Sequence, residues 1–353
     1  MNNEAQIRRA TLIGHRAVEQ LDAELAQALI DLYEAQAEDI AARIRAHAGA
    51  DGAVSLQELR ALLDQVQAIL RRLTDERNAL LNEALGKAAD YGARPALGTI
   101  LETGTVIPTP ASMAVAKEAL HFVQTFVAED GLQISDRIWR LDRGARDAIV
   151  NALESAVIQG HGATQASREF LARGAAVPGD LVTKSQAGAA EGLAARTGEL
   201  MTGDGGALFQ AHRVFRTEIN RAHGEAYMMG GEDHPDFAGW RFLLSPAHPR
   251  PDICDLLSEQ NLYGLGPGVY PSRDACPWPA HPNTLSFLTM VFKDEVSPED
   301  KAGKETPMAA LDRLTPEQRD GVLGKGKAEI FNEGKLRQGM IRSTLDAVRK
   351  RIG

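Results

Sequence analysis

The N-terminal part of the chain repeats apolar residues at helical spacing. Residues three or four apart share one face of an α-helix, and two such faces follow each other over residues 1–92. The first contains Val18, Leu21, Leu25, Leu32 and Ile40, and the second contains Leu59, Leu62, Val66, Leu70 and Leu73. The stretch ADGAVSLQEL separates them, and Ser55 and Glu58 in it are spaced as a capping box for the second helix. The pattern predicts a helical hairpin whose apolar faces meet.

A linker and further helices are predicted next. The linker, residues 93–110, is rich in Pro, Gly and Thr, and helical periodicity resumes over residues 111–205. Gly160 is expected to end one of these helices, because glycine is the usual residue at a helix C-terminus.

The helix expected from about residue 206 to 229 has a second, polar stripe. Arg216, Asn220, His223 and Tyr227 recur four, three and four residues apart. Such a stripe either faces solvent or holds the proline-rich loop downstream by hydrogen bonds.

Two short aromatic-rich runs then predict strands. Phe237–Ser245 and Thr284–Phe292 are bounded by turn residues and bracket a long loop. Inside the loop, Asp252 is the expected N-cap of a short helix, and LYGLGPGVYP is expected to be irregular. We therefore predict a mainly α protein with a small α+β domain at residues 206–296, in which short strands bracket a Pro/Gly-rich loop.

The C-terminal segment, residues 297–353, is predicted to be helical and basic from residue 325. Ser or Thr precedes Pro in SPEDKAG and LTPEQRDGVL, which is typical of helix starts. From residue 325 onward, eight Lys or Arg stand against three Asp or Glu, a net charge of +5. A negatively charged partner would bind here. The alternative is a solvated amphipathic helix with Ile341, Leu345 and Val348 turned to the core.

Composition narrows the class of protein. The net charge is −9, so the chain as a whole is not built to coat nucleic acid. The sequence contains no apolar run of the roughly 20 residues that span a bilayer, and the N-terminus does not have the pattern of a signal peptide. Two cysteines do not make a disulfide framework, so a reducing cytoplasm is expected.

The loop between the predicted strands contains the candidate chemistry. His248, Cys254, Cys276 and His281 offer the nitrogen and sulfur ligands of a tetrahedral zinc site. Their spacing has no Cys-x-x-Cys or His-x₃₋₅-His pair, so no cofactor is expected. In a second interpretation Cys254 is a nucleophile, with a histidine as base and Asp252 orienting it.

The preferred interpretation of the loop is structural. Eight prolines lower the entropy lost when it is ordered, and Trp278 and Tyr270 can cover the core between the strands.

Several segments resemble the phage Mu F-like head morphogenesis family, the minor head proteins of tailed phages and prophages. They are Arg216-Thr217-Glu218, Trp240, SPAHPRPDICDLLSEQN, GVYP and PAHPNTLSFL. The resemblance covers roughly residues 131–292, and more loosely 314–330. Leu257 and Thr284 stand where many members have cysteines, which weighs further against zinc.

The resemblance implies a structural protein without catalytic residues, acting in head morphogenesis near the portal. It would be located in the virion head, and in the host cytoplasm during assembly. The implied partners are the portal or the major capsid protein, with packaged double-stranded DNA as a further candidate and no membrane. The alternative is a metal- or Cys-dependent hydrolase or nuclease toxin that uses the His/Cys loop.

Two sets of residues follow from these interpretations. The set expected to build or present the loop is Arg216, His223, Trp240, His248, Asp252, Trp278, His281 and Asn283. The set expected to contact DNA or the portal is Lys335, Arg337, Arg342, Arg349, Lys350 and Arg351.

Overall fold

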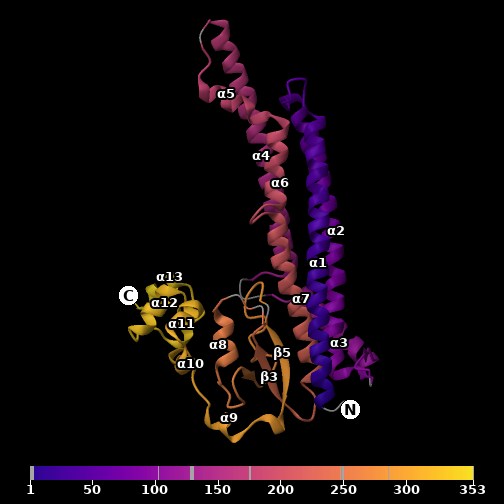
Figure 1. Cartoon of the computed structure of the whole chain (residues 1–353), viewed down its shortest axis with the longest axis vertical. Coiled ribbons are helices and arrows are strands. Elements are labelled where there is room, and N and C mark those ends of the chain that lie inside the picture. Colours follow the sequence, from indigo (N-terminus) through magenta and orange to yellow (C-terminus); the bar gives the residue numbers. More distant parts are fainter. Residues whose placement is uncertain are drawn as a thin grey trace. The chain divides into compact units, whose positions relative to one another are not determined.

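The computed structural model describes residues 4–101, 103–127, 131–174, 176–246, 248, 250–284 and 286–352. The chain forms two compact units. Unit 1 comprises Met1–Leu21, Leu85–Val123 and Arg216–Gly353, and unit 2 comprises Asp22–Ala84 and Gln124–Phe215. The predicted fold class is confirmed: the protein is mainly helical, with short antiparallel strands in the C-terminal half (Figure 1). The predicted division into consecutive domains stays a prediction.

Helices α1 (Glu4–Ala46) and α2 (Leu56–Leu97) follow the apolar pattern of the N-terminal sequence. Both contribute residues to unit 1 and to unit 2. Glu58 N–H donates to Ser55 Oγ (3.3 Å) at the start of α2, as the capping pattern predicts. Helix α2 continues through Pro95 into the predicted linker, where β1 (Thr99–Ile100) and β2 (Val106–Ile107) then pair antiparallel. Helix α3 (Pro110–Thr125) follows them.

Unit 2 is completed by helices from the middle of the chain. They are α4 (Ile134–Ala172), α5 (Gly179–Ser185), the 3₁₀ turn η1 (Gln186–Gly188), α6 (Ala190–Thr202) and the first residues of α7 (Ala207–Gly231). The expectation that Gly160 ends a helix is wrong, because α4 continues through it. A Cβ at Gly160 would lie 2.7 Å from Gly188 N, so this glycine permits a close backbone approach.

Unit 2 also contains an ion pair whose arginine is buried and whose carboxylate is 25% exposed. Arg77 on α2 is 1% exposed, and its guanidinium donates to both carboxylate oxygens of Asp142 on α4, at 2.6 and 3.0 Å. The same guanidinium donates to the Tyr33 hydroxyl on α1 at 3.4 Å. The pair therefore joins three helices of this unit.

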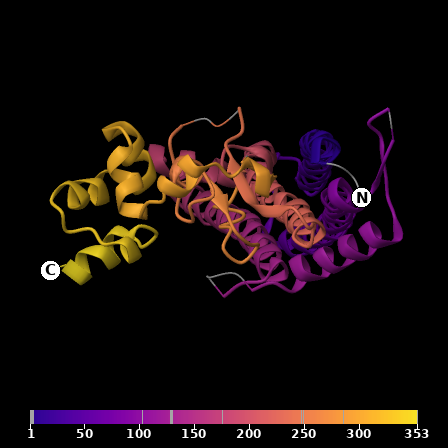
Figure 2. The same ribbon diagram turned by 90° about the horizontal axis from the view of Figure 1, so that it is seen from below.

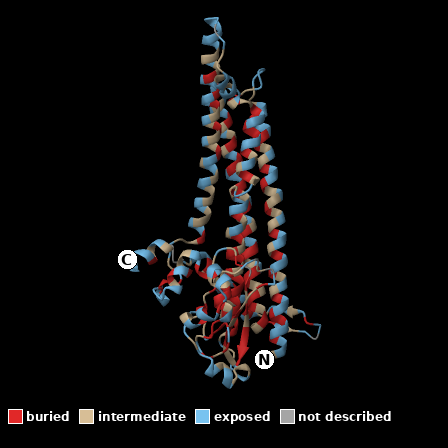
Figure 3. Cartoon of the chain, turned by 60° about the vertical axis from the view of Figure 1, so that its left-hand side comes forward, coloured by how far each residue is buried: buried red, intermediate tan, exposed pale blue. Residues whose placement is uncertain are grey.

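The small sheet of unit 1 has three strands in the order β4-β3-β5. Strands β3 (Phe237–Leu243) and β5 (Phe287–Phe292) are the two predicted strands, each shorter than expected. Strand β4 (Val269–Tyr270) lies within LYGLGPGVYP, which was expected to be irregular, and pairs with β3 in the register Trp240↔Tyr270. Buried residues gather at this sheet (Figure 3).

The C-terminal helices of unit 1 are grouped together (Figure 2), and all but the first of them form a small core of their own. They are α9 (Pro298–Ala302), α10 (Pro307–Arg313), α11 (Pro316–Leu323), α12 (Lys325–Asn332) and α13 (Leu345–Ile352), with the 3₁₀ turn η3 (Gln338–Met340) before α13. The expected N-caps Ser297 and Thr315 accept backbone hydrogen bonds, which confirms those helix starts. Another 3₁₀ turn, η2 (Lys293–Glu295), leads into α9. No helix in the described ranges is long and apolar enough to cross a membrane.

Candidate functional site

The proline-rich loop is bound to the polar stripe of α7. Asn283 N–H donates to Thr217 Oγ1 (2.8 Å), and Arg216 Nη1 donates to Asn283 Oδ1 (3.3 Å). One turn further along, Asn220 Nδ2 donates to Thr284 O (2.7 Å), and Asn220 O accepts from Trp278 Nε1 (3.2 Å). The stripe therefore holds the loop, and its interpretation as a solvated face is wrong.

The next two residues of the stripe, His223 and Tyr227, are buried. Tyr227 Oη accepts from Met290 N on β5 (3.0 Å), so it joins α7 to the sheet. Burial first, and then the nearby His15, lower the pKa of His223 to about 3. His223 Nε2 has no hydrogen-bond partner among the described residues. The neutral imidazole is therefore the form that the fold accommodates.

The buried imidazole predicts that acid destabilises the protein. His223 faces the Tyr227 ring and His15, whose Nε2 lies 3.3 Å from Glu19 Oε1. Because the folded pKa lies below the unfolded value of 6.5, the stabilisation is complete above pH 6.5 and is lost as pH falls towards 3. By pH 5 the loss should be about 2 kcal/mol.

This loss can be measured by urea unfolding of the wild type and of His223→Leu at pH 7 and pH 5. Groups other than His223 and the nearby His15 titrate alike in both proteins, so they cancel in the comparison. On acidification, the wild type should lose about 2 kcal/mol more than the variant. Equal losses would show that His223 is not a buried neutral imidazole.

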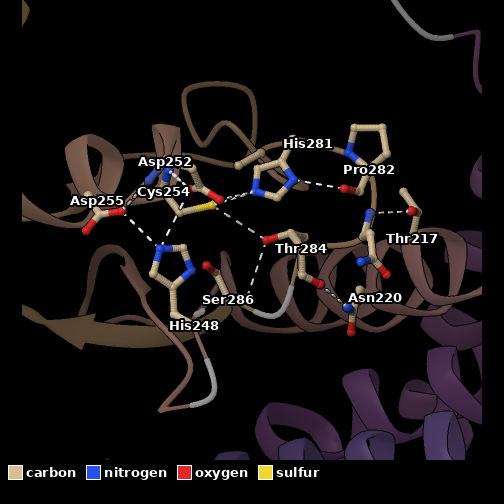
Figure 4. Close-up of polar contacts among 12 residues, drawn as sticks. Thr217, Asn220, His248, Asp252, Cys254, Asp255, His281, Pro282, Thr284 and Ser286 are labelled. Atoms are coloured by element: carbon tan, nitrogen blue, oxygen red, sulfur yellow. Dashed lines mark hydrogen bonds and ion pairs between the residues drawn. The ribbon is translucent and has the colours of Figure 1, made fainter. Parts of the chain in front are cut away.

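Asp252, Cys254 and His281 form a compact cluster at the start of α8 (Ile253–Glu259) (Figure 4). Asp252 is the N-cap, as predicted, and its Oδ1 accepts from Cys254 N (2.7 Å). His281 Nε2 lies 3.1 Å from Asp252 Oδ2 and 3.1 Å from Cys254 Sγ. The helix start thus brings two ligand-type side chains to a histidine that the loop supplies.

Both nitrogens of His281 face acceptors. Its Nδ1 lies 2.8 Å from Pro282 O, and its Nε2 faces the Asp252 carboxylate. The hydrogen bond to Asp252, then that to Cys254, raise the pKa of His281 to about 10 against the opposing effect of burial. Partial burial alone would raise the pKa of Asp252, but the hydrogen bonds from His281 and Cys254 outweigh it and lower this pKa to about 2. Without a metal, the two side chains form an ion pair.

His248 lies beside the cluster and contacts it through Asp252. His248 Nε2 is 3.0 Å from Asp255 Oδ2 and 3.9 Å from Asp252 Oδ1. Asp255 Oδ2 also accepts from Asp252 N (2.7 Å), which completes a capping box. The sequence interpretation did not assign Asp255 to the site, although the Asp-x-x-Asp spacing of a capping box was visible in it.

Cys276 does not belong to the cluster. The proposed ligand set His248, Cys254, Cys276 and His281 is therefore not assembled as expected, although Cys276 is buried and has a free thiol. Burial first, and then Glu225, raise the pKa of the Cys276 thiol to about 12, so it stays protonated. Asp252, rather than Cys276, supplies the third ligand-type group.

The cluster does not have the geometry of a nucleophilic triad. Asp252 and Cys254 contact the same nitrogen of His281, whereas an orienting carboxylate binds the nitrogen opposite the nucleophile. Cys254 is 0% exposed, so a substrate cannot reach its sulfur in this conformation.

The remaining predicted residues separate into core and surface. Trp240 and Trp278 are in the core around the sheet.

In the C-terminal segment, Arg342 Nη2 donates to Ala280 O (3.0 Å), and Lys335 pairs with Glu333 (2.8 Å). Of the residues predicted to contact DNA or the portal, Arg337, Arg349, Lys350 and Arg351 are exposed and form no ion pair among the described residues. Ile341 and Val348 are buried, and Leu345 packs on the same cluster, as the amphipathic interpretation predicts.

Comparison of the chain with models of protein families, with curated proteins and with solved structures found no match in any of the three. The family resemblance therefore stays a prediction that depends on the residues named above.

Proposed function

We propose that the protein is a structural minor head protein of a tailed phage or prophage, acting in head morphogenesis near the portal. The observation that carries this proposal is that residues of the resembling segments contact one another, although they lie far apart in the sequence. Arg216, Thr217 and Asn283 bind one another, and Trp240 lies in the core around the sheet of the same unit. Contacts between these segments support a resemblance of one folded region rather than of isolated positions.

The end of α13 is the proposed contact for a negatively charged partner. Arg349, Lys350 and Arg351 are consecutive and exposed in its last turn, whereas Val348 anchors the helix in the core. This combines the two interpretations of the basic segment, because an amphipathic helix packs by one side and presents charge on the other. Contacts of this kind to DNA phosphates release counterions and weaken steeply with salt.

Binding to proheads tests the proposal. The full chain should co-sediment with portal-containing proheads built from the capsid genes that neighbour its own gene. The variant Arg349→Gln/Lys350→Gln/Arg351→Gln should be recovered in clearly smaller amounts. Duplex DNA is tested in parallel at low and physiological salt, and binding through phosphates should fall with salt and show no sequence preference.

The control makes the same change of charge elsewhere on unit 1. Lys117, Lys301 and Lys304 are exposed and lie outside the basic segment, and their triple substitution by Gln should leave recovery unchanged. A wild-type chain that stays out of the prohead fraction would overturn the proposal. The absence of capsid and portal genes around its own gene would overturn it as well.

A further inference from the structure

The cluster at the start of α8 has the ligand types and the spacing of a zinc site. Cys254 Sγ, His281 Nε2 and an Asp252 oxygen all lie within 4.8 Å of one another. Around tetrahedral zinc, ligand atoms at the usual bond lengths are about 3.3–3.6 Å apart. His281 Nε2 lies 3.1 Å from each of its two partners, slightly closer than these separations. Side-chain adjustments of a few tenths of an ångström would therefore admit the ion.

The surrounding hydrogen bonds fix these side chains in the orientation that a metal requires. A zinc-bound histidine usually passes its other N–H to a carbonyl, and His281 Nδ1 lies 2.8 Å from Pro282 O. A ligating carboxylate is usually held by further donors, and Asp252 Oδ1 accepts from Cys254 N at 2.7 Å. Thr284 Oγ1 lies 3.7 Å from Cys254 Sγ, where its hydroxyl can donate to a metal-bound sulfur.

His248 lies close enough to the cluster to supply a fourth ligand. His248 belongs to a second ligand group with Asp252 and Asp255, so the two groups share Asp252. The His248 ring is about as buried as the carboxylate of Asp255, with which it pairs. Release of that contact would let His248 turn its Nε2 to an ion held beside Asp252.

We propose that Asp252, Cys254 and His281, with His248 in the fourth position, bind one structural Zn²⁺ ion. Four protein ligands and a buried sulfur close the site to substrate, which is typical of structural rather than catalytic zinc. The ion would join α8 to a loop residue 27 positions further along the chain. It would thereby stabilise a loop that has little regular backbone hydrogen bonding. The missing Cys-x-x-Cys pair is no obstacle, because Asp252 and Cys254 come from the same helix start.

Metal analysis of the purified full chain tests this site. After exposure to Zn²⁺ and removal of the excess, the wild type should retain about one zinc per chain. Cys254→Ser and His281→Gln should retain almost none, and His248→Gln should bind at least tenfold more weakly. Cys276→Ser is the matched control, because it removes the other buried thiol and should retain the metal. A chelator should lower the melting temperature of the wild type and of Cys276→Ser.

Cobalt gives a measurement that needs no variant. Co²⁺ bound by a thiolate in a tetrahedral site produces sulfur-to-metal charge-transfer absorption and intense visible bands. These bands should appear when Co²⁺ is added to the metal-free wild type and should disappear when Zn²⁺ displaces it. A wild type that retains no zinc and gives no such bands would overturn the proposal, as would equal loss of zinc in Cys276→Ser and Cys254→Ser. Neither result depends on whether the protein binds proheads.

Discussion

Replacing Trp278 by alanine should lower the free energy of unfolding by about 3–5 kcal/mol. The indole is 8% exposed, packs edge-on against Phe242 at 5.9 Å between ring centroids, and donates from Nε1 to Asn220 O. It also lies against α7 at Gly224, where an added methyl group would overlap it. The truncation would therefore leave a cavity between α7 and the sheet, and Asn220 O would lose its donor.

Urea unfolding measures this effect, and Trp139→Ala is the matched control. Trp139 is 56% exposed on α4, so its truncation should cost less than about 1 kcal/mol. A loss of similar size in both variants would contradict the assignment of Trp278 to the core. The loop would then be a surface feature, and a direct role in recognition would have to be considered.

The substitution Asp142→Asn should cost about 3–5 kcal/mol. It preserves the shape of the side chain but removes the negative charge opposite Arg77, whose side chain is 2% exposed. A buried guanidinium without its carboxylate loses most of the attraction that offsets its desolvation. The other acceptors of the guanidinium, Tyr33 Oη at 3.4 Å and Asn78 Oδ1 at 3.0 Å, are neutral and do not replace the lost charge.

A second ion pair of the same unit provides the control for Asp142. Asp39 accepts from Arg72 at 2.6 Å, but both side chains are solvent-accessible, at 30% and 51%. Asp39→Asn should therefore cost no more than about 1 kcal/mol. In the double variant Arg77→Met/Asp142→Leu, stability should recover to near the wild-type value, since apolar residues of similar volume can replace a buried pair. If Asp142→Asn and Asp39→Asn cost the same, the Arg77 site is hydrated.

The features that the sequence predicted correctly depend on interactions within a few residues. The long helices α1 and α2 follow from apolar side chains three and four residues apart. The helix starts at Asp252, Ser297 and Thr315 follow from side chains that bond to backbone N–H groups two or three residues away. The buried side of α13 follows from periodicity in the same way.

The tertiary structure decided which residues meet across long separations in the chain. It placed Arg216 against Asn283, 67 residues later, and so determined that the polar stripe of α7 faces the loop. It placed Gly160 of α4 against the backbone of Gly188, and it paired the short strand β4 with β3. In the candidate site it selected Asp252 as the partner of Cys254 and His281, and left Cys276 outside. Local pattern fixes which side of a helix is polar, but the choice among several polar or apolar partners depends on how the whole chain packs, since no short-range interaction distinguishes them.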